Sequence, residues 1–236
     1  MRGATGDRRT LDAPVPRPEE ARAFRRRLQA WYRRNARDLP WRRTRDPYHI
    51  LISELMLQQT QVSRVIDFYH RFLDRFPDLA TLARARRPQV VAAWEGLGYY
   101  ARARNLHALA RTVTTTRDGV IPGDPAHLRE LPGIGAYTAG AVASFAYERR
   151  AALVDTNVAR VLQRVFAPQL PLKSAAGLRR LWAIAEGILP RTGKATWTHN
   201  QALMELGALV CSARAPKCGK CPVGSLCASR DRYEDR

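Results

Sequence analysis

The stretch Leu131-Pro-Gly-Ile-Gly135 interrupts two runs of helical periodicity. Apolar residues recur at helical spacing on both sides of it, at Leu128 and Leu131 before the break and at Ala139, Val142, Ala143 and Phe145 after it. One proline and two glycines within five residues are typical of a tight turn. The stretch therefore predicts a helix, a hairpin and a second helix, with backbone N–H groups placed to hold a phosphate.

A lone carboxylate follows this hairpin at a distance. Asp155 lies among apolar residues in the segment Val154-Asp-Thr-Asn-Val158, 20 residues beyond Gly135. A phosphate-binding hairpin that leads to an isolated acid suggests chemistry on a nucleic acid. The alternative is a plain helical hairpin followed by an aspartate that only caps a helix.

The charge balance points in the same direction. The 236 residues include 40 Lys and Arg against 21 Asp and Glu, a formal net charge of +19. Such a charge favours a polyanionic partner, of which nucleic acid is the commonest. The alternative is an arginine-rich composition whose basic side chains are simply solvated. With 45% hydrophobic residues, the chain can also bury a real core.

The sequence shows no targeting or membrane segment. No apolar run reaches the roughly 18 residues of a transmembrane helix, and Met1–Pro18 is polar and rich in Arg and Pro. We expect a disordered basic arm over residues 1–18. We also expect a cytoplasmic, nucleoid-associated chain of bacterial type, in a compartment where thiols stay reduced.

The rest of the chain reads as an all-α protein with short loops, because no segment alternates like a half-buried strand. Helices are expected at 19–37, 50–67, 68–76, 79–83, 88–96, 102–117, 157–166, 174–189 and 198–210. The residues Gly96-Leu-Gly98 predict a turn before the sixth of these helices.

All four cysteines lie near the C-terminal end, at Cys211, Cys218, Cys221 and Cys227. Tetrahedral zinc and a [4Fe–4S] cluster are both candidates for four thiolates in a compact loop. Zinc sites usually show two close cysteine pairs, whereas here only Cys218 and Cys221 are close. The spacing therefore favours one [4Fe–4S] cluster per chain, and disulfides are not expected.

Taken together, these motifs resemble the helix-hairpin-helix DNA glycosylases, in the branch that includes endonuclease III and the A/G-specific adenine glycosylases. The Leu131–Gly135 hairpin, the Asp155 segment and the cysteine tail carry the resemblance. Four further stretches make the chain most similar to the adenine glycosylases: Pro40-Trp-Arg42, Ser53-Glu-Leu-Met-Leu-Gln-Gln-Thr-Gln-Val62, Gly96-Leu-Gly-Tyr-Tyr-Ala-Arg-Ala-Arg-Asn-Leu-His107 and Asn200-Gln-Ala-Leu-Met-Glu-Leu-Gly-Ala208.

The resemblance implies two helical domains and a DNA partner. A six-helix domain would span residues 46–151, and residues 19–45 would form an N-terminal helix that packs with the C-terminal helices and cluster loop of 152–236. We expect a monomer that binds double-stranded DNA with a mismatched or oxidised base pair, held across the cleft between the domains.

Base excision is related to glycoside hydrolysis, so it needs an acid for the leaving base and an anion beside the sugar cation. Glu54 fits the acid, because it stands on an otherwise apolar helix. By resemblance it protonates the adenine ring through N7. Asp155 fits the anion, stabilised by the helix start at Asn157. By resemblance Asp155 stabilises or traps the sugar cation, and Asn157 helps hold it.

The residue at position 137 decides the reaction type. A lysine there would attack the sugar, form a Schiff base and nick the strand, as in endonuclease III. This chain has Tyr137, as some adenine glycosylases do. The resemblance therefore predicts a monofunctional glycosylase, in which the tyrosine orients the acid and shields the cation.

Further site residues follow from the resemblance. Gln59 and Tyr99 match residues that enter the duplex near the lesion. Trp41, Arg42 and Leu57 match the lining of the adenine pocket. Candidate backbone contacts come from Leu131, Gly133 and Gly135 in the hairpin and from Lys217 and Lys220 in the basic cysteine loop.

Two departures from the adenine glycosylase pattern leave other functions open. The catalytic segment reads Asp155-Thr-Asn157 where Asp-Gly-Asn is usual, and the sequence ends at Arg236 where such enzymes continue into a domain that recognises 8-oxoguanine. We expect removal of adenine opposite 8-oxoguanine or guanine, with weaker discrimination between the two. The alternatives are a T:G or U:G mismatch glycosylase and a non-catalytic iron–sulfur DNA-binding protein.

Overall fold

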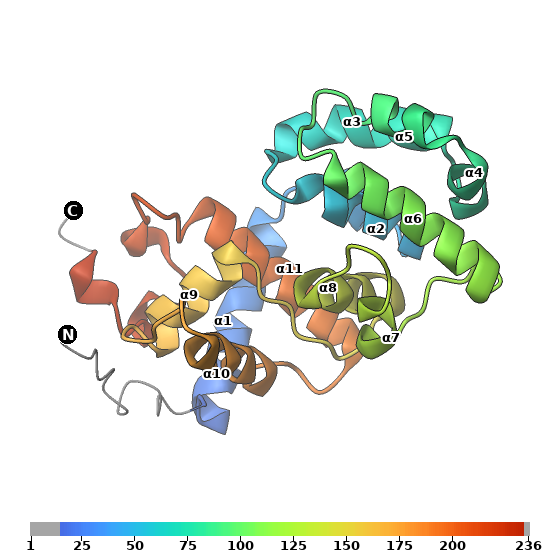
Figure 1. The fold of residues 1–236 in the computed structure, drawn as a ribbon. Coiled ribbons are helices and arrows are strands. Elements are labelled where there is room, and N and C mark those ends of the chain that lie inside the picture. Colours follow the sequence, from blue (N-terminus) through green and yellow to red (C-terminus); the bar gives the residue numbers. More distant parts are fainter. Residues whose placement is uncertain (1–14, 234–236) are drawn as a thin grey trace, which may run out of the picture. The chain divides into compact units, whose positions relative to one another are not determined.

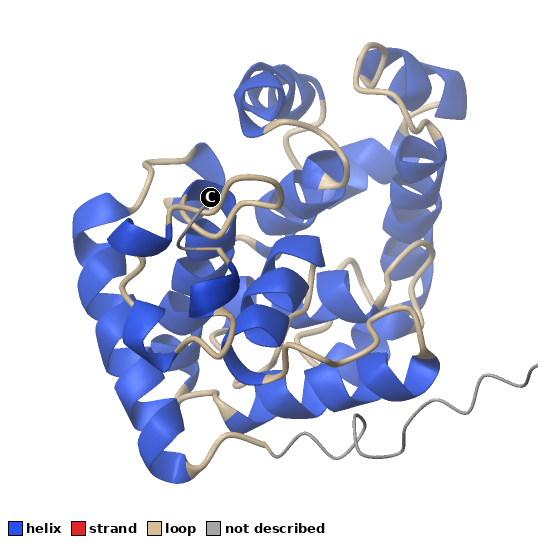
Figure 2. Cartoon of the chain, turned by 90° about the vertical axis from the view of Figure 1, so that its left-hand side faces the viewer, coloured by secondary structure: helices blue, strands red, loops and turns tan. Residues whose placement is uncertain are grey.

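The computed structural model of the chain describes residues 15–233 (Figure 1). Within these residues all regular structure is helical, so the predicted all-α class is confirmed (Figure 2). The disordered arm predicted for residues 1–18 lies outside the described residues as far as residue 14. Among the described helices, none combines the length and the apolar character that crossing a membrane requires.

The chain divides into two compact units. One contains Met1–Ala36 together with Arg150–Arg236, and the other contains Arg37–Arg149. Residues 37–45, which the sequence analysis grouped with the N-terminal helix, instead cluster with the second unit. The reason is local packing: the buried Trp41 ring lies edge-on to the ring of Tyr69, 5.5 Å away between centroids.

The first unit is built on α1 (Pro18–Asn35), α9 (Thr156–Phe166), α10 (Ala175–Gly187) and α11 (Gly193–Leu209). Helix α11 packs against both α1 and α9, and α10 packs against α9. Short 3-10 turns follow at Cys218–Lys220, Gly224–Leu226 and Arg230–Arg232. Helix α11 begins five residues before the predicted Thr198, because the Thr192 hydroxyl caps it by accepting from the N–H of Ala195.

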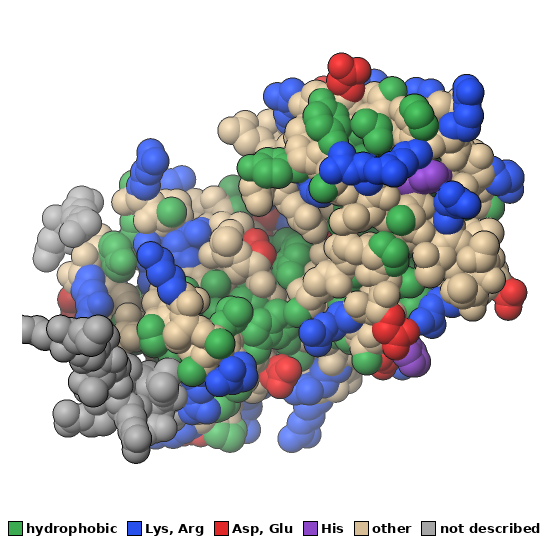
Figure 3. Space-filling view, viewed as in Figure 1, with side chains coloured by type: hydrophobic (Ala, Val, Ile, Leu, Met, Phe, Trp, Pro, Cys, Tyr) green, Lys and Arg blue, Asp and Glu red, His purple; other side chains and the backbone are tan. Residues whose placement is uncertain are grey.

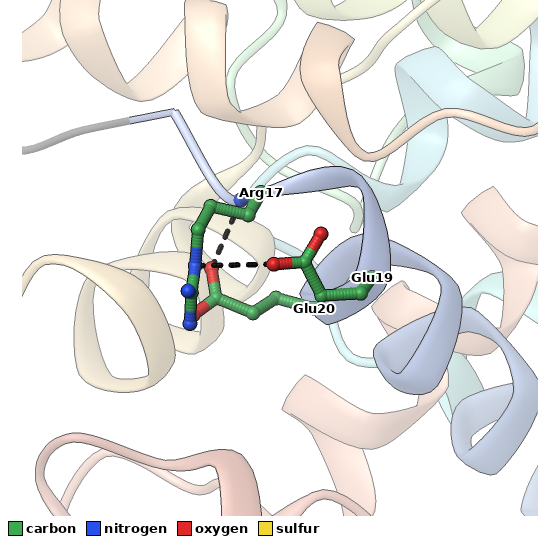
Figure 4. A network of polar contacts seen from close by, with 3 residues as sticks. All are labelled: Arg17, Glu19 and Glu20. Carbon is green, nitrogen blue, oxygen red and sulfur yellow. Dashed lines mark hydrogen bonds and ion pairs between the residues drawn. The ribbon is translucent and has the colours of Figure 1, made fainter.

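Helix α1 begins in a small exposed network (Figure 4). The Arg17 guanidinium donates to Glu20 Oε1 at 2.7 Å, and the Arg17 N–H donates to Glu20 Oε2 at 2.9 Å. Pro18 occupies the first helical position, where its missing N–H would be unsatisfied anyway. Arg17 and Pro18 therefore belong to the helix start, and the predicted disorder is wrong for these two residues.

The second unit surrounds the buried helix α2 (Pro47–Leu57), which packs against α8 (Ala136–Tyr147), α3 (Val62–Arg75) and α6 (Ala101–Thr116). Asp46 caps α2 by accepting from the N–H groups of Tyr48 and His49. The smaller helices of the second unit are Pro40–Arg42, α4 (Leu79–Arg84), α5 (Arg87–Ala93) and α7 (Pro125–Arg129). Residues 50–56 are all buried, so α2 has no wet face.

The single helix predicted for residues 50–67 is wrong. The chain leaves the helix at Gln58 and restarts at Val62, and Gln59 adopts a left-handed φ of 56°. Helix α2 is buried on all sides, whereas α3 buries only one stripe formed by Val65, Tyr69 and Phe72. One straight helix cannot satisfy both patterns, so the polar residues between them form a turn.

The predicted hairpin is confirmed between α7 and α8. Gly133 has a φ of +77°, and a Cβ on it would lie 2.6 Å from the Cβ of Asn105. Both the backbone conformation and the close approach of α6 therefore require glycine. The turn delivers the chain to Gly135, which precedes the first helical residue of α8.

Helix α11 carries a fully buried histidine. His199 is 0% exposed, lies edge-on to the ring of Phe24, and neither ring nitrogen has a hydrogen-bond partner. Burial lowers the pKa of His199 from 6.5 to about 3. The folded chain therefore keeps this ring neutral at pH values where the unfolded chain protonates it.

This difference predicts acid sensitivity of the fold. Because the unfolded state binds the proton first, stability falls as the pH drops below 6.5 and continues to fall towards pH 3. We expect a loss of about 2 kcal/mol from this group between pH 7 and pH 5. Urea unfolding followed by circular dichroism at both pH values measures it.

The His199→Leu variant should lose less stability over this pH interval than the wild type. The exposed His127→Gln variant serves as the control and should follow the wild type. Equal losses in the wild type and His199→Leu would contradict the assignment.

Candidate active site

A buried carboxylate and a tyrosine meet in the second unit. Glu54 on α2 is 3% exposed, and the Tyr137 hydroxyl on α8 donates to Glu54 Oε2 at 2.7 Å. Tyr137 itself is only partly buried. A buried carboxyl group with one hydroxyl partner is the arrangement expected of a proton donor held in a fixed orientation.

A second hydrogen bond, from the residue that follows α2 to the neighbour of Tyr137, reinforces the contact between α2 and α8. The Gln58 side-chain amide donates to the Thr138 hydroxyl at 3.3 Å. Thr138 is buried and is the neighbour of Tyr137. Gln58, which the sequence offered only as part of a polar run, therefore helps fix the helix start that carries Tyr137.

Asp155 has the predicted helix-capping geometry in the first unit. Its Oδ1 accepts from the N–H of Val158 at 2.6 Å, and its Oδ2 accepts from the side-chain amide of Asn157 at 3.0 Å. Both carboxylate oxygens are thus engaged, and Asp155 is half-buried at the start of α9. These bonds fix the orientation of the carboxyl group.

Arg160 extends this arrangement towards the cysteine segment. Its guanidinium donates to Asn157 Oδ1 at 2.8 Å, to the Gly207 carbonyl at 2.8 Å and to the Cys211 carbonyl at 2.7 Å. Sequence reasoning missed Arg160. The only available signal was its position one helical turn after Asn157, on the same face of α9.

The four cysteines border a single cavity of the first unit, which is also lined by apolar side chains such as Val161 and Leu206. No disulfide joins these cysteines within residues 15–233. Arg164 Nη1 lies 3.4 Å from Cys211 Sγ and also donates to the Ser212 carbonyl. Burial raises the pKa of Cys221 to about 11 and also raises the pKa of Cys227.

The thiols surround this cavity without converging on one point. Within residues 15–233, no group of three or more His, Cys, Asp or Glu side chains could hold a single metal ion.

The hairpin offers backbone to a ligand. Gly133 and Gly135 are exposed, whereas Leu131 is 3% exposed and can contribute only its backbone to any contact. Lys217 and Lys220 are exposed in the cysteine segment. On the face shown in Figure 3, Lys and Arg side chains are more widespread than Asp and Glu, as the net charge requires.

The two residues predicted to enter a duplex are exposed and share an unusual backbone conformation. Gln59 is exposed and Tyr99 is 61% exposed. Their φ angles are 56° and 48°, in the left-handed region that residues other than glycine rarely adopt. Strained backbone of this kind concentrates at functional sites.

The predicted base-pocket residues differ in exposure. Trp41 is 6% exposed and packs against Tyr69, so most of its ring belongs to the core of the second unit. Arg42 is half-buried and donates to the Arg37 carbonyl at 2.9 Å. Leu57, the last residue of α2, is half-buried. Their roles in base recognition remain predictions.

The pair formed by Glu54 and Tyr137 leads to a stability prediction. Replacing Tyr137 by Phe removes a hydrogen bond from a buried carboxyl group and should lower the free energy of unfolding by about 1–3 kcal/mol. In a double-mutant cycle with Glu54→Gln, measured by urea unfolding, the two effects should be non-additive.

Tyr147→Phe is the matched control, because that hydroxyl also extends from α8 but donates to the Ile121 carbonyl. It should be additive with Glu54→Gln. An additive Tyr137→Phe variant would mean that the hydrogen bond contributes nothing to the fold.

Comparison with known protein families supports the grouping of these residues. A family model described as HhH-GPD superfamily base excision DNA repair protein matches residues 52–183. These residues include Glu54, the hairpin with Tyr137, and Asp155 with Asn157 and Arg160, but not the cysteines.

Individual relatives agree with this match. The adenine DNA glycosylase of Homo sapiens is 43% identical over 224 residues, which cover 91% of this chain and 41% of the human protein. That of Mycolicibacterium smegmatis is 46% identical over 197 residues, 83% of this chain and 66% of the relative. The chain thus spans about two fifths of the human protein and two thirds of the mycobacterial one.

Among solved structures, a thermostable thymine-DNA glycosylase superposes with a TM-score of 0.82 at 31% identity. The superposition covers 91% of this chain and 98% of that protein. The agreement in fold therefore extends beyond the segment matched by the family model.

Proposed function

The chain belongs to the HhH-GPD superfamily of base excision DNA repair proteins, and from this premise we propose that it removes adenine mispaired with 8-oxoguanine or guanine in double-stranded DNA. The observation that carries the proposal is the hydrogen bond between Tyr137 and the buried Glu54. The identity of 43–46% to adenine DNA glycosylases supports adenine as the base.

In this proposal Glu54 is the acid. Adenine leaves only if its ring is protonated as the glycosidic bond breaks, so the acid must be protonated and close to the base. Burial on α2 favours the neutral carboxyl group over the carboxylate. The Tyr137 hydroxyl fixes the orientation of the carboxyl group, which directs its proton towards the flipped base.

Asp155 is the anion that faces the developing sugar cation. Its two oxygens are held by the Val158 N–H and the Asn157 amide, which fix the orientation of the carboxylate. A fixed negative charge in a partly buried site stabilises an oxocarbenium-like transition state, after which water attacks the sugar carbon. The products are a free adenine and an abasic sugar.

We infer a monofunctional reaction. Strand nicking needs an amine that forms a Schiff base with the opened sugar, and position 137 carries a phenol that cannot do so. The strand should therefore remain intact until alkali is added.

The four cysteines form the proposed site of a [4Fe–4S] cluster. Support comes from their shared cavity and from the basic donor Arg164 beside Cys211. Each of the four cysteines that line this cavity would supply one thiolate ligand to the cluster. The bound cluster would fix the loop that presents Lys217 and Lys220 to the DNA backbone.

A second candidate function has its own support. The structural match to a thymine-DNA glycosylase covers nearly the whole of that protein. A T:G or U:G mismatch glycosylase would use the same fold and the same Asp155. It differs in the base that enters the pocket.

Four duplexes decide between these functions: A:8-oxoguanine, A:G, T:G and U:G, each assayed for excision with and without alkali. We expect cleavage at adenine only after alkali treatment. Cleavage at thymine or uracil would support the second candidate, and cleavage without alkali would contradict the monofunctional reaction. An absence of cleavage from all four would favour the non-catalytic DNA-binding protein.

The Asp155→Asn variant is the matched control for this assay. It keeps the cap on α9 but loses the charge, so excision should fall at least about a hundredfold while binding to the A:G duplex persists. A variant that excises at the wild-type rate would exclude Asp155 as the stabilising anion.

Metal content tests the cluster separately. The Cys221→Ser variant should lose iron, acid-labile sulfide and the visible absorbance of a cluster, because one of four ligands is removed. Ser225→Ala, in the same segment but without a thiol, should keep all three. If the wild type contained stoichiometric zinc and showed no visible absorbance, the cysteines would form a zinc site and not a cluster site.

A further inference from the structure

One buried arginine joins two segments of the second unit, each of which contains an exposed residue with a positive φ. Arg102, near the start of α6, is 7% exposed. Its Nη1 donates to the carbonyls of Leu55, Met56 and Gln58 at 2.8, 2.9 and 2.5 Å. These carbonyls belong to the C-terminal end of α2 and to the residue that precedes Gln59.

The second nitrogen of the same guanidinium reaches the other segment. Arg102 Nη2 donates to the carbonyls of Leu97 and Gly98 at 3.3 and 3.1 Å, and to the Thr60 hydroxyl at 3.3 Å. Gly98 precedes Tyr99, and Thr60 follows Gln59. The Arg102 side chain therefore binds Gln58 and Thr60, the two neighbours of Gln59. It also binds Gly98, the residue before Tyr99.

All of these acceptors are neutral oxygens, and burial lowers the pKa of Arg102. A buried cation held without a carboxylate is costly for a protein to maintain. Capping α2 alone would need only the carbonyls of Leu55 and Met56. The bonds to Leu97 and Gly98 add nothing to that helix, so they need another explanation.

The two residues that Arg102 flanks are both exposed, and both have a positive φ. Gln59 and Tyr99 have φ angles of 56° and 48°. Left-handed backbone persists outside glycine only where the surroundings enforce it. The Arg102 guanidinium also lies 5.6 Å from the centre of the Tyr99 ring and 5.5 Å from that of the buried Trp94, which places the tyrosine against a fixed cation.

We propose that Arg102 is a positioning residue that sets Gln59 and Tyr99 at a fixed separation for insertion into the duplex beside the flipped base. The inference rests on the proposed function and deepens it. The planar guanidinium is essential, because its two terminal nitrogens point to two different segments. A lysine ammonium can satisfy one group of carbonyls but cannot span both.

Arg102→Lys is the main test. Its single-turnover excision of adenine from an A:8-oxoguanine duplex should fall about ten- to hundredfold, because displacement of positioning groups by about 1 Å costs that much. Binding to an undamaged duplex should change by less than about threefold, since phosphate contacts carry it. Wild-type excision by Arg102→Lys would overturn the proposal.

A second readout does not depend on excision. In the Asp155→Asn background, 2-aminopurine placed next to the mispaired adenine should brighten on binding, because insertion breaks its stacking. Adding Arg102→Lys should abolish most of this rise at saturating protein. If the fluorescence rise were the same with and without Arg102→Lys, the proposal would be overturned. If Arg102→Lys abolished the rise, the proposal would be supported. Both conclusions hold even if the wild type excised no base. Absence of wild-type excision alone would count against the proposed function instead.

Leu109→Ala is the control for simple destabilisation. Leu109 is fully buried on the same helix α6, but no hydrogen bond ties its side chain to either segment. This variant should lower the melting temperature and leave the excision rate per folded molecule and the 2-aminopurine signal near wild type. If it reduces both as much as Arg102→Lys does, Arg102 acts only through stability.

Arg102→Met covers the case in which lysine proves too conservative. It keeps an unbranched side chain and removes every donor, so it should lose the 2-aminopurine signal. If it does not fold, Arg102→Ala refolded with methylguanidinium should recover the signal, whereas methylammonium should not. Equal recovery with the two ions would overturn the need for a planar fork.

Discussion

A carboxyl group buried in the centre of an apolar helix is the constraint on which the second unit depends. Helix α2 is covered by neighbouring helices over its whole middle section, and Glu54 sits within that section. A polar group in such a place must have a fixed partner, or the fold loses stability. The Tyr137 hydroxyl is one such partner, and it fixes which residue of α8 faces α2. The hairpin before α8 then has to end at Gly135, two residues before Tyr137.

In the first unit the corresponding carboxyl group, that of Asp155, is only half-buried. The two Asp155 oxygens accept from the N–H of Val158 and from the side-chain amide of Asn157. Arg160 in turn donates to the side-chain oxygen of Asn157. The same arginine binds the carbonyl of Cys211. The geometry of the acid therefore depends on residues from α9, the end of α11 and the cysteine segment. A displacement of any of these three segments would therefore move the Asp155 carboxylate.

The sequence was sufficient for features that have a local cause. Periodicity and glycine spacing predicted the hairpin, and Asp155 capped its helix as its position before α9 implied. The burial of Glu54 followed from the apolar residues around it. The break after Leu57 was missed, because the polar residues from Gln58 to Gln61 are compatible with an exposed helical turn and only the burial of α2 excludes one. Arg102 and Arg160 were missed for another reason: their partners are backbone carbonyls distant in sequence, which leave no pattern in side-chain type.

The contact between α9 and α11 adds a constraint of a different kind. A Cβ on Gly207 would lie 2.7 Å from the Cβ of Asn157. The two helices can approach this closely only because residue 207 has no side chain. A side chain at this position would first displace Asn157, whose amide donates to Asp155. An alanine at position 207 would therefore act first on the hydrogen bond that orients Asp155, so the spacing of α9 and α11 links helix packing directly to the acid.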